Sequence, residues 1–189
     1  MPEPTVLPGD VDELRAQAAR GIRLRYLLFW GHQPQRDGSV GPGCLSQWWS
    51  VEFVINDVRY PSAEHWMMVG KARLFGDDVI AERILATPDP GAVKALGRKV
   101  RGFDEDVWQR HRFDLVVAGN VAKFGQHPDL GRYLLATGTR ILVEASPVDR
   151  VWGIGLAAAD PRAEDPTQWR GLNLLGFALM RARTHLAVG

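Results

Sequence analysis

The sequence predicts an α+β fold, a single mostly helical domain with a small antiparallel or mixed sheet. Two observations predict this class. Short apolar runs typical of strands lie at residues 22–30 and 140–146, whereas apolar residues recur at helical spacing through most of the intervening chain. A length of 189 residues suits one domain, and 46% hydrophobic with 24% charged residues is ordinary for a soluble globular protein.

The first part of the chain divides into an extension and the opening of the domain. We expect residues 1–21 to form an N-terminal extension with a short helix, capped by Asp10, and residues 22–189 to form the domain. A strand over residues 22–30 opens the domain, and a loop rich in Gly and Pro follows it. The next expected elements are strands over 48–55 and 58–60, joined by a hairpin turn at Asn56-Asp57.

The middle and the end of the chain are predicted to be mainly helical. A helix begins at Pro61 or Ser62 and ends at Gly76. Further helices are expected over residues 77–86, 90–100, 104–124, 128–136 and, at the end, 172–186. The strand over 140–146 interrupts them and is stopped by Pro147.

Composition excludes several classes of protein. With 23 Lys and Arg against 22 Asp and Glu, the formal charge is +1, which argues against a broad basic surface for nucleic acid and leaves only local contacts. Cys44 is the single cysteine, so an intramolecular disulfide and a four-cysteine zinc site are excluded. The N-terminal residues lack the order of a signal peptide and no long apolar run exists, so we expect a cytoplasmic protein with no membrane contact.

One candidate site lies on the helix that begins at Ser62. Glu64 and Lys71 are seven residues apart, about two helical turns, so both project from nearly the same side. A carboxylate close to an amine allows each group to set the pKa of the other. From spacing alone, a solvated helix surface is the simpler interpretation. His65 has no paired histidine spacing, so no metal is expected.

A second candidate site follows the strand over 140–146. Glu144 lies among apolar neighbours, where a carboxylate is either partnered or shifted in pKa. Asp149 comes in the loop after the strand, and Trp152 with Gly153 adds a flat aromatic wall and closely approachable backbone. A glycine-containing turn with a buried Trp is an equally good interpretation of this pattern.

Basic and aromatic residues near predicted loops are candidates for contacts with phosphate and base. Arg98 and Lys123 could bind a phosphate, Arg through its fork and Lys as a point charge. The chain has seven Trp, and Trp30 and Trp108 join Trp152 as candidates to line a pocket. Stacking of a base on an aromatic ring contributes roughly 1–3 kcal/mol, although most Trp residues in a domain belong to the core.

Taken together, seven blocks of the sequence resemble the NADAR family, the YbiA-like proteins. The similarity covers about residues 27–186, with every block in order. The blocks are FWGH (29–32), LSQWW (45–49), YPSAEHWMMVGKARLF (60–75), LGRKVRGF (96–103), AKFGQHPDL (122–130), LVEASPVDRVWGIGL (142–156) and GLNLLGFALMRAR (171–183).

The resemblance implies an N-glycosidase that acts where a ribose C1 carries a nitrogen and needs no cofactor. Two substrate classes are implied: phosphoribosylaminopyrimidine intermediates of riboflavin biosynthesis, and ADP-ribosylated guanine in nucleic acid. The matching positions are Glu64 and Lys71 on the helix, Trp108 in mid-chain, Asp149 with Trp152 and Gly153, and Asn173. Bacterial members have WGDG where Ile154 stands here, so a role carried by that Asp would pass to Asp149, or the activity would differ.

The resemblance makes Glu64, Lys71 and Asp149 the expected catalytic residues. Cleavage of a C1–N bond requires a carboxylate near the developing positive charge and a proton for the leaving nitrogen. An alternative route is attack by a neutral Lys71 amine to form a Schiff base. A non-catalytic module that binds ADP-ribose or another nucleotide is the alternative function, and the oligomeric state is left open.

Overall fold

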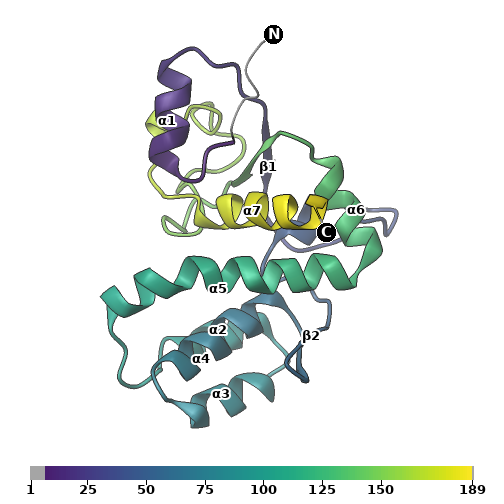
Figure 1. Cartoon of the computed structure of the whole chain (residues 1–189), viewed down its shortest axis with the longest axis vertical. Helices are drawn as coiled ribbons and strands as arrows, with labels where there is room; N and C mark the ends of the chain where they lie inside the picture. Colours follow the sequence, from purple (N-terminus) through teal and green to yellow (C-terminus); the bar gives the residue numbers. More distant parts are fainter. Residues whose placement is uncertain (1–6, 189) are drawn as a thin grey trace. The chain divides into compact units, whose positions relative to one another are not determined.

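A computed structural model of the chain describes residues 7–188. By internal packing, the chain forms two compact units. The first comprises the chain up to Trp30 together with the chain from Tyr133 onward, and the second comprises Gly31–Arg132. Figure 1 labels helices α1 to α7 and strands β1 and β2. The mostly helical α+β class predicted from the sequence is confirmed in these described residues.

The second unit is a cluster of helices with one hairpin. Its elements are η1 (Pro42–Leu45), β2 (Phe53–Ile55), β3 (Val58–Tyr60), α2 (Ala63–Leu74), α3 (Asp78–Leu85), α4 (Pro90–Gly97) and α5 (Glu105–Gln126). Helix α2 packs against α3, α4 and α5. Helices α2, α3 and α4 all lie on the same side of the longer helix α5 (Figure 1). Helix α6 (Pro128–Ala136) then leads the chain from this unit into the first.

Side-chain caps set where these helices begin. Ser62, Asp77, Asp89 and Asp104 precede α2, α3, α4 and α5, and each side chain accepts a backbone N–H from the first turn. Those N–H groups have no carbonyl partner inside the helix, so each cap stabilises a helix start by about 1 kcal/mol. Of the two starts predicted for α2, Pro61 and Ser62, the structure has Ser62 as the cap.

The hairpin confirms the turn predicted at Asn56-Asp57. Both residues have positive φ, 50° and 63°, as a type I′ turn requires. Strand β2 is much shorter than the predicted 48–55, because Ser46 folds the preceding residues into a turn: its hydroxyl accepts the N–H of Trp48 and its carbonyl accepts that of Trp49. Those backbone groups are therefore not available to a strand ladder.

The first unit is built around two parallel strands, β1 (Tyr26–Phe29) and β4 (Ile141–Glu144). Helix α7 (Leu174–Val188) packs against β4, and helix α1 (Val11–Ala19) packs against the short turn η2 (Pro166–Gln168). None of the helices in residues 7–188 is long and apolar enough to cross a bilayer.

Helix α1, the short helix expected in the N-terminal extension, packs on this unit. Leu14 is fully buried, and the Arg15 guanidinium Nε donates to the Pro166 carbonyl at 3.0 Å. The helix is capped by Asp10 as predicted. It ends at Ala19, and Gly21, with a φ of 74°, then turns the chain so that the Ile22 N–H donates to the Gln17 carbonyl. Because of this turn, the strand predicted to begin at residue 22 begins only at Tyr26.

Candidate active site

Glu64 lies in the first turn of α2 and is 2% exposed. Its backbone N–H donates to the Gln47 carbonyl at 2.9 Å. The chain segment before the hairpin therefore supplies an acceptor to a helix start that has none of its own. A carboxylate at this end also interacts favourably with the helix dipole. The structure thus holds an acidic side chain, well shielded from water, at a fixed place in the second unit.

The segment that holds Glu64 is itself held by α5. The Lys123 ammonium donates to the carbonyls of Cys44 and Ser46, at 2.7 and 2.8 Å, and Asn120 Nδ2 donates to Gln47 Oε1 at 3.0 Å. Lys123 is fully buried, and burial lowers its pKa to about 7. The predicted contact of Lys123 with a phosphate does not fit this placement, because the ammonium is enclosed and engaged with backbone.

Lys71 lies in the last turn of α2 and is half-buried. Its ammonium nitrogen is 4.1 Å from the centroid of the Phe103 ring and 5.7 Å from that of Trp108. Burial lowers the pKa of Lys71, and the Glu105 carboxylate acts in the opposite direction. Such an amine releases its proton more readily than an exposed lysine, as an acid or a nucleophile requires.

The two aromatic residues beside Lys71 differ in exposure. Trp108 is 7% exposed, so its indole has little free face for a stacked base, whereas Phe103 is 41% exposed. Phe103 is absent from the residues predicted from the sequence. A usable signal was present: an apolar residue just before the helix cap Asp104 commonly packs on the residue four positions into the helix, here Trp108.

Asp149 belongs to the first unit and organises the turn after β4. Its Oδ1 accepts the N–H of Val151 at 2.9 Å and of Trp152 at 2.8 Å, and its own N–H donates to the Ser146 hydroxyl. The Gly155 N–H donates to its carbonyl. These bonds set the course of residues 149–155, and half-buried Trp152 with them.

The sequence suggested that Gly153 allows a close approach to its backbone. In the structure, the groups that lie close to Gly153 are other parts of the protein backbone. A Cβ there would lie 2.9 Å from the Glu144 carbonyl oxygen and 3.1 Å from that of Asp149. Ile154, which replaces the second Asp of the bacterial pattern, is fully buried, and its N–H donates to the Glu144 carbonyl. An apolar side chain suits that interior position.

Asn173 pairs with the edge of β4. Its Oδ1 accepts the Glu144 N–H at 3.0 Å and its Nδ2 donates to the Leu142 carbonyl at 2.9 Å, while its φ is 53°. The side chain therefore takes the place of a neighbouring strand and is fully buried. Its donor and acceptor serve the junction of β4 with α7, which differs from the substrate contact that the resemblance implied.

The remaining predicted residues lie at the surface. Trp30, just after β1, is 66% exposed, and Arg98 is exposed at the end of α4. The second unit therefore brings Glu64, Lys71 and Trp108 onto two packed helices. The first unit gathers Glu144, Asp149, Trp152, Gly153 and Asn173 around one turn.

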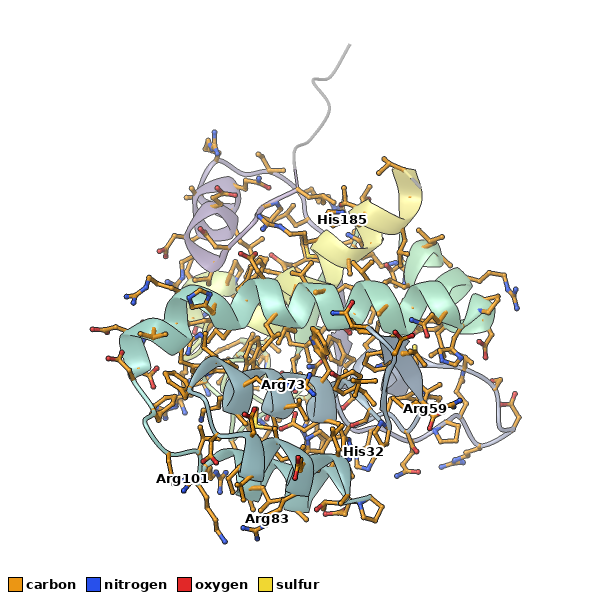
Figure 2. The ribbon with its side chains drawn as sticks, turned by 60° about the horizontal axis from the view of Figure 1, so that its bottom comes forward. His32, Arg59, Arg73, Arg83, Arg101 and His185 are labelled. Atoms are coloured by element: carbon orange, nitrogen blue, oxygen red, sulfur yellow. The ribbon has the colours of Figure 1, made fainter. Side chains whose placement is uncertain are left out.

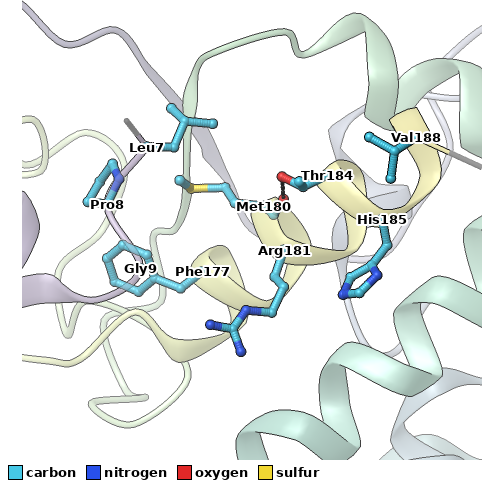
Figure 3. A pocket seen from close by; sticks show the side chains of 9 residues that line it. All are labelled: Leu7, Pro8, Gly9, Phe177, Met180, Arg181, Thr184, His185 and Val188. Atoms are coloured by element: carbon cyan, nitrogen blue, oxygen red, sulfur yellow. Dashed lines mark hydrogen bonds between the residues drawn. The ribbon is translucent and has the colours of Figure 1, made fainter. Parts of the chain in front are cut away.

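A cavity in the first unit is lined by none of the predicted site residues. It has a volume of about 480 Å³ and lies in the first unit, between residues 7–9 and one face of α7 (Figure 3). Figure 3 shows Phe177, Met180, Arg181 and His185 along that face. The geometry of the titratable groups, and not this cavity, therefore identifies the candidate chemistry.

Comparison with known proteins agrees with the blocks recognised in the sequence. The family model described as NADAR domain matches residues 28–187. "N-glycosidase R617" of Acanthamoeba polyphaga mimivirus is 42% identical over 84% of this chain and 95% of its own length. "Riboflavin biosynthesis protein PYRR, chloroplastic" of Zea mays is 31% identical over 67% of this chain and 20% of its own length.

A solved structure shares the fold. The NMR structure of the Escherichia coli protein YbiA matches with a TM-score of 0.69 over 93% of both chains, at 24% identity. The chain is an enzyme of the hydrolase class that acts on N-glycosyl bonds. It belongs to the NADAR domain family.

Proposed function

We propose that this enzyme hydrolyses the bond between ribose C1 and nitrogen in a phosphoribosylaminopyrimidine of riboflavin biosynthesis, with Glu64 and Lys71 of α2 as its catalytic residues. The observation that carries the proposal is the combination on one helix of a buried carboxylate and a half-buried amine of lowered pKa. The name of the maize relative supports the substrate class. A net charge of +1 suits a small substrate with few phosphates.

Each residue has a distinct task in this proposal. As the C1–N bond breaks, its electron pair leaves with the nitrogen and positive charge builds on the ribose ring. The Glu64 carboxylate stabilises that charge and accepts a proton from the water whose oxygen joins C1. The Lys71 ammonium gives its proton to the leaving nitrogen, a transfer that its lowered pKa favours.

A covalent route uses the same amine differently. Neutral Lys71 attacks C1 of the opened ribose, the amine nitrogen bonds to C1, the base departs with a proton, and water later releases the sugar. Borohydride reduces such a Schiff base to a stable adduct. A mass increase on Lys71 of the wild type after borohydride, absent without substrate, establishes this route, while turnover with no trapped adduct establishes direct hydrolysis.

The test of the substrate class is product release. The enzyme is incubated separately with a phosphoribosylaminopyrimidine and with an oligonucleotide carrying ADP-ribosylated guanine, and free base and sugar products are measured by mass. We expect free pyrimidine and ribose phosphate from the first. Release of ADP-ribose from the oligonucleotide alone would replace the proposed substrate. Saturable binding of either compound without products would make the protein a nucleotide-binding module.

A further inference from the structure

The ring of Phe103 is held in place from both sides. Gly102, with a φ of 68°, turns the chain just before it, and Phe103 precedes the cap Asp104 of α5. The Phe75 ring at the end of α2 meets the Phe103 ring edge-on, with centroids 5.3 Å apart and an angle of 64°. An edge-to-face contact of this kind favours one ring orientation.

The face of that fixed ring lies against the amine of the proposed site. The Lys71 nitrogen is 4.1 Å from the Phe103 centroid, closer than to Trp108 at 5.7 Å. An ammonium over an aromatic face is attracted by the partial negative charge of the ring quadrupole at that face, by about 0.5–1 kcal/mol at a partly exposed site. Without this contact, the long lysine side chain would sample several rotamers.

We propose that Phe103 is a positioning residue, which holds the Lys71 ammonium over its ring face and shields it from water. This inference rests on the proposed function for the chemical role of Lys71, whereas the contact itself does not. Phe103 is 41% exposed, so its replacement should leave the packing of the unit intact. Trp108 is buried and would not separate positioning from stability.

The pKa of Lys71 is subject to two opposing influences, so a change in it can be measured. Burial lowers the pKa of Lys71, and the nearby Glu105 carboxylate raises it. Glu105 also faces Arg112, with 3.7 Å between Oε1 and a guanidinium nitrogen. The ring face favours the charged amine, so an aliphatic side chain of similar volume should lower the pKa of Lys71 further.

The test compares Phe103→Leu with Phe103→Tyr in the full chain. A limiting amount of acetic anhydride is applied over a range of pH, and acetylation of Lys71 is measured by mass spectrometry against exposed Lys99 in the same sample. Only the neutral amine reacts, so the ratio reports protonation of Lys71 independently of turnover. We expect this ratio at pH 7 to rise about two- to fivefold in Phe103→Leu and to stay near the wild type in Phe103→Tyr.

Turnover separates the two proposals. If Phe103→Leu raises the ratio and lowers kcat with little change in KM, while Phe103→Tyr does neither, Phe103 positions a catalytic amine. A raised ratio in an enzyme that cleaves no ribosyl substrate would keep the positioning role and overturn the proposed function. An unchanged ratio in Phe103→Leu and in a second aliphatic variant, Phe103→Met, would overturn the positioning role even if turnover is intact.

Discussion

At the scale of single residues, Asp149 has a structural task that can be separated from a chemical one. Its Oδ1 accepts two backbone N–H groups, which an asparagine carbonyl oxygen can also do. We predict that Asp149→Asn keeps the melting temperature and most of the activity. Asp149→Ala, which loses both bonds, should lose about 1–2 kcal/mol of stability, measured by urea unfolding.

The same pair of variants tests whether Asp149 also takes part in the reaction. If Asp149→Asn unfolds like the wild type yet loses activity by a hundredfold or more, its negative charge takes part in the reaction. The catalytic role expected from the sequence would then hold, and the turn would be a second duty of the same side chain.

His65 predicts how stability depends on pH. Its Nε2 lies 2.7 Å from the Thr87 carbonyl and its Nδ1 lies 2.7 Å from the Ser62 hydroxyl, and burial lowers its pKa. The unfolded chain therefore binds a proton more readily than the folded one. Stability contributed by neutral His65 is present above about pH 6.5 and is lost as pH falls from there toward its lower folded pKa.

The measurement is the free energy of unfolding of the wild type and of His65→Gln between pH 8 and pH 5. The wild type should lose up to about 1.4 kcal/mol per pH unit from this histidine, over and above what the variant loses. Parallel curves for the two proteins would show that His65 does not titrate differently in the folded state.

At the scale of elements, local chemistry predicted most of the fold. The hairpin at Asn56-Asp57 and the start of α2 at Ser62 follow from preferences of a few adjacent residues, and both are confirmed. The parallel pairing of β1 with β4 could not be predicted, because it joins residues more than a hundred positions apart. The support of Glu64 by the Gln47 carbonyl, between residues 17 positions apart, also lies beyond what local preferences predict.

Replacement by Ala should affect stability very differently at two glycines, Gly176 at the junction of α7 with β4 and Gly70 in α2. A Cβ on Gly176 would collide with the Leu142 carbonyl oxygen and with the Asn173 amide, whereas a Cβ on Gly70 in α2 would meet only the movable end of Leu115. Both changes to Ala add similar helix propensity, about 1 kcal/mol. The backbone of β4 cannot move aside as a side chain can.

We therefore predict that Gly176→Ala destabilises the protein by about 3 kcal/mol, and that Gly70→Ala changes stability by no more than about 1 kcal/mol. Thermal and urea unfolding of the two variants provide the measurement. Equal stability of the two would mean that β4 and α7 do not approach as closely as described.

For the whole molecule, the sequence left open how distant segments of the chain pack together. One domain with an appended N-terminal segment was expected, yet α1 packs within the first unit and the chain returns to that unit from Tyr133 onward. Composition carries no information on which distant segments meet. The candidate residues themselves came from the family resemblance, since spacing alone favoured a solvated surface for Glu64 and Lys71.

Charge predicts a weak effect of salt on substrate recognition. Figure 2 labels three exposed arginines of the second unit, Arg59, Arg73 and Arg101. Each has a polar partner: Arg59 bonds Glu52 at 2.6 Å, Arg101 bonds Asp77 at 2.7 Å and Arg73 donates to the Tyr60 hydroxyl. A net charge of +1 argues against a broad basic surface, whose contacts with many phosphates would release many counterions.

We expect KM for a phosphoribosyl substrate to rise less than about tenfold between 50 and 200 mM salt, as measured by initial rates. A protein with six to ten phosphate contacts would lose about 10³–10⁵ in affinity over that range. A steep dependence of that order would point to an extended nucleic acid as the natural substrate.

The proposed chemistry depends on one helix, α2, through Glu64 and Lys71. Its most direct test is the single-turnover release of free base from a phosphoribosylaminopyrimidine by the wild type, Glu64→Gln and Lys71→Met, each checked for folding by its melting temperature. We predict that both variants fold and that each releases base at least about a hundredfold more slowly than the wild type. Release by either folded variant at nearly the rate of the wild type would contradict it.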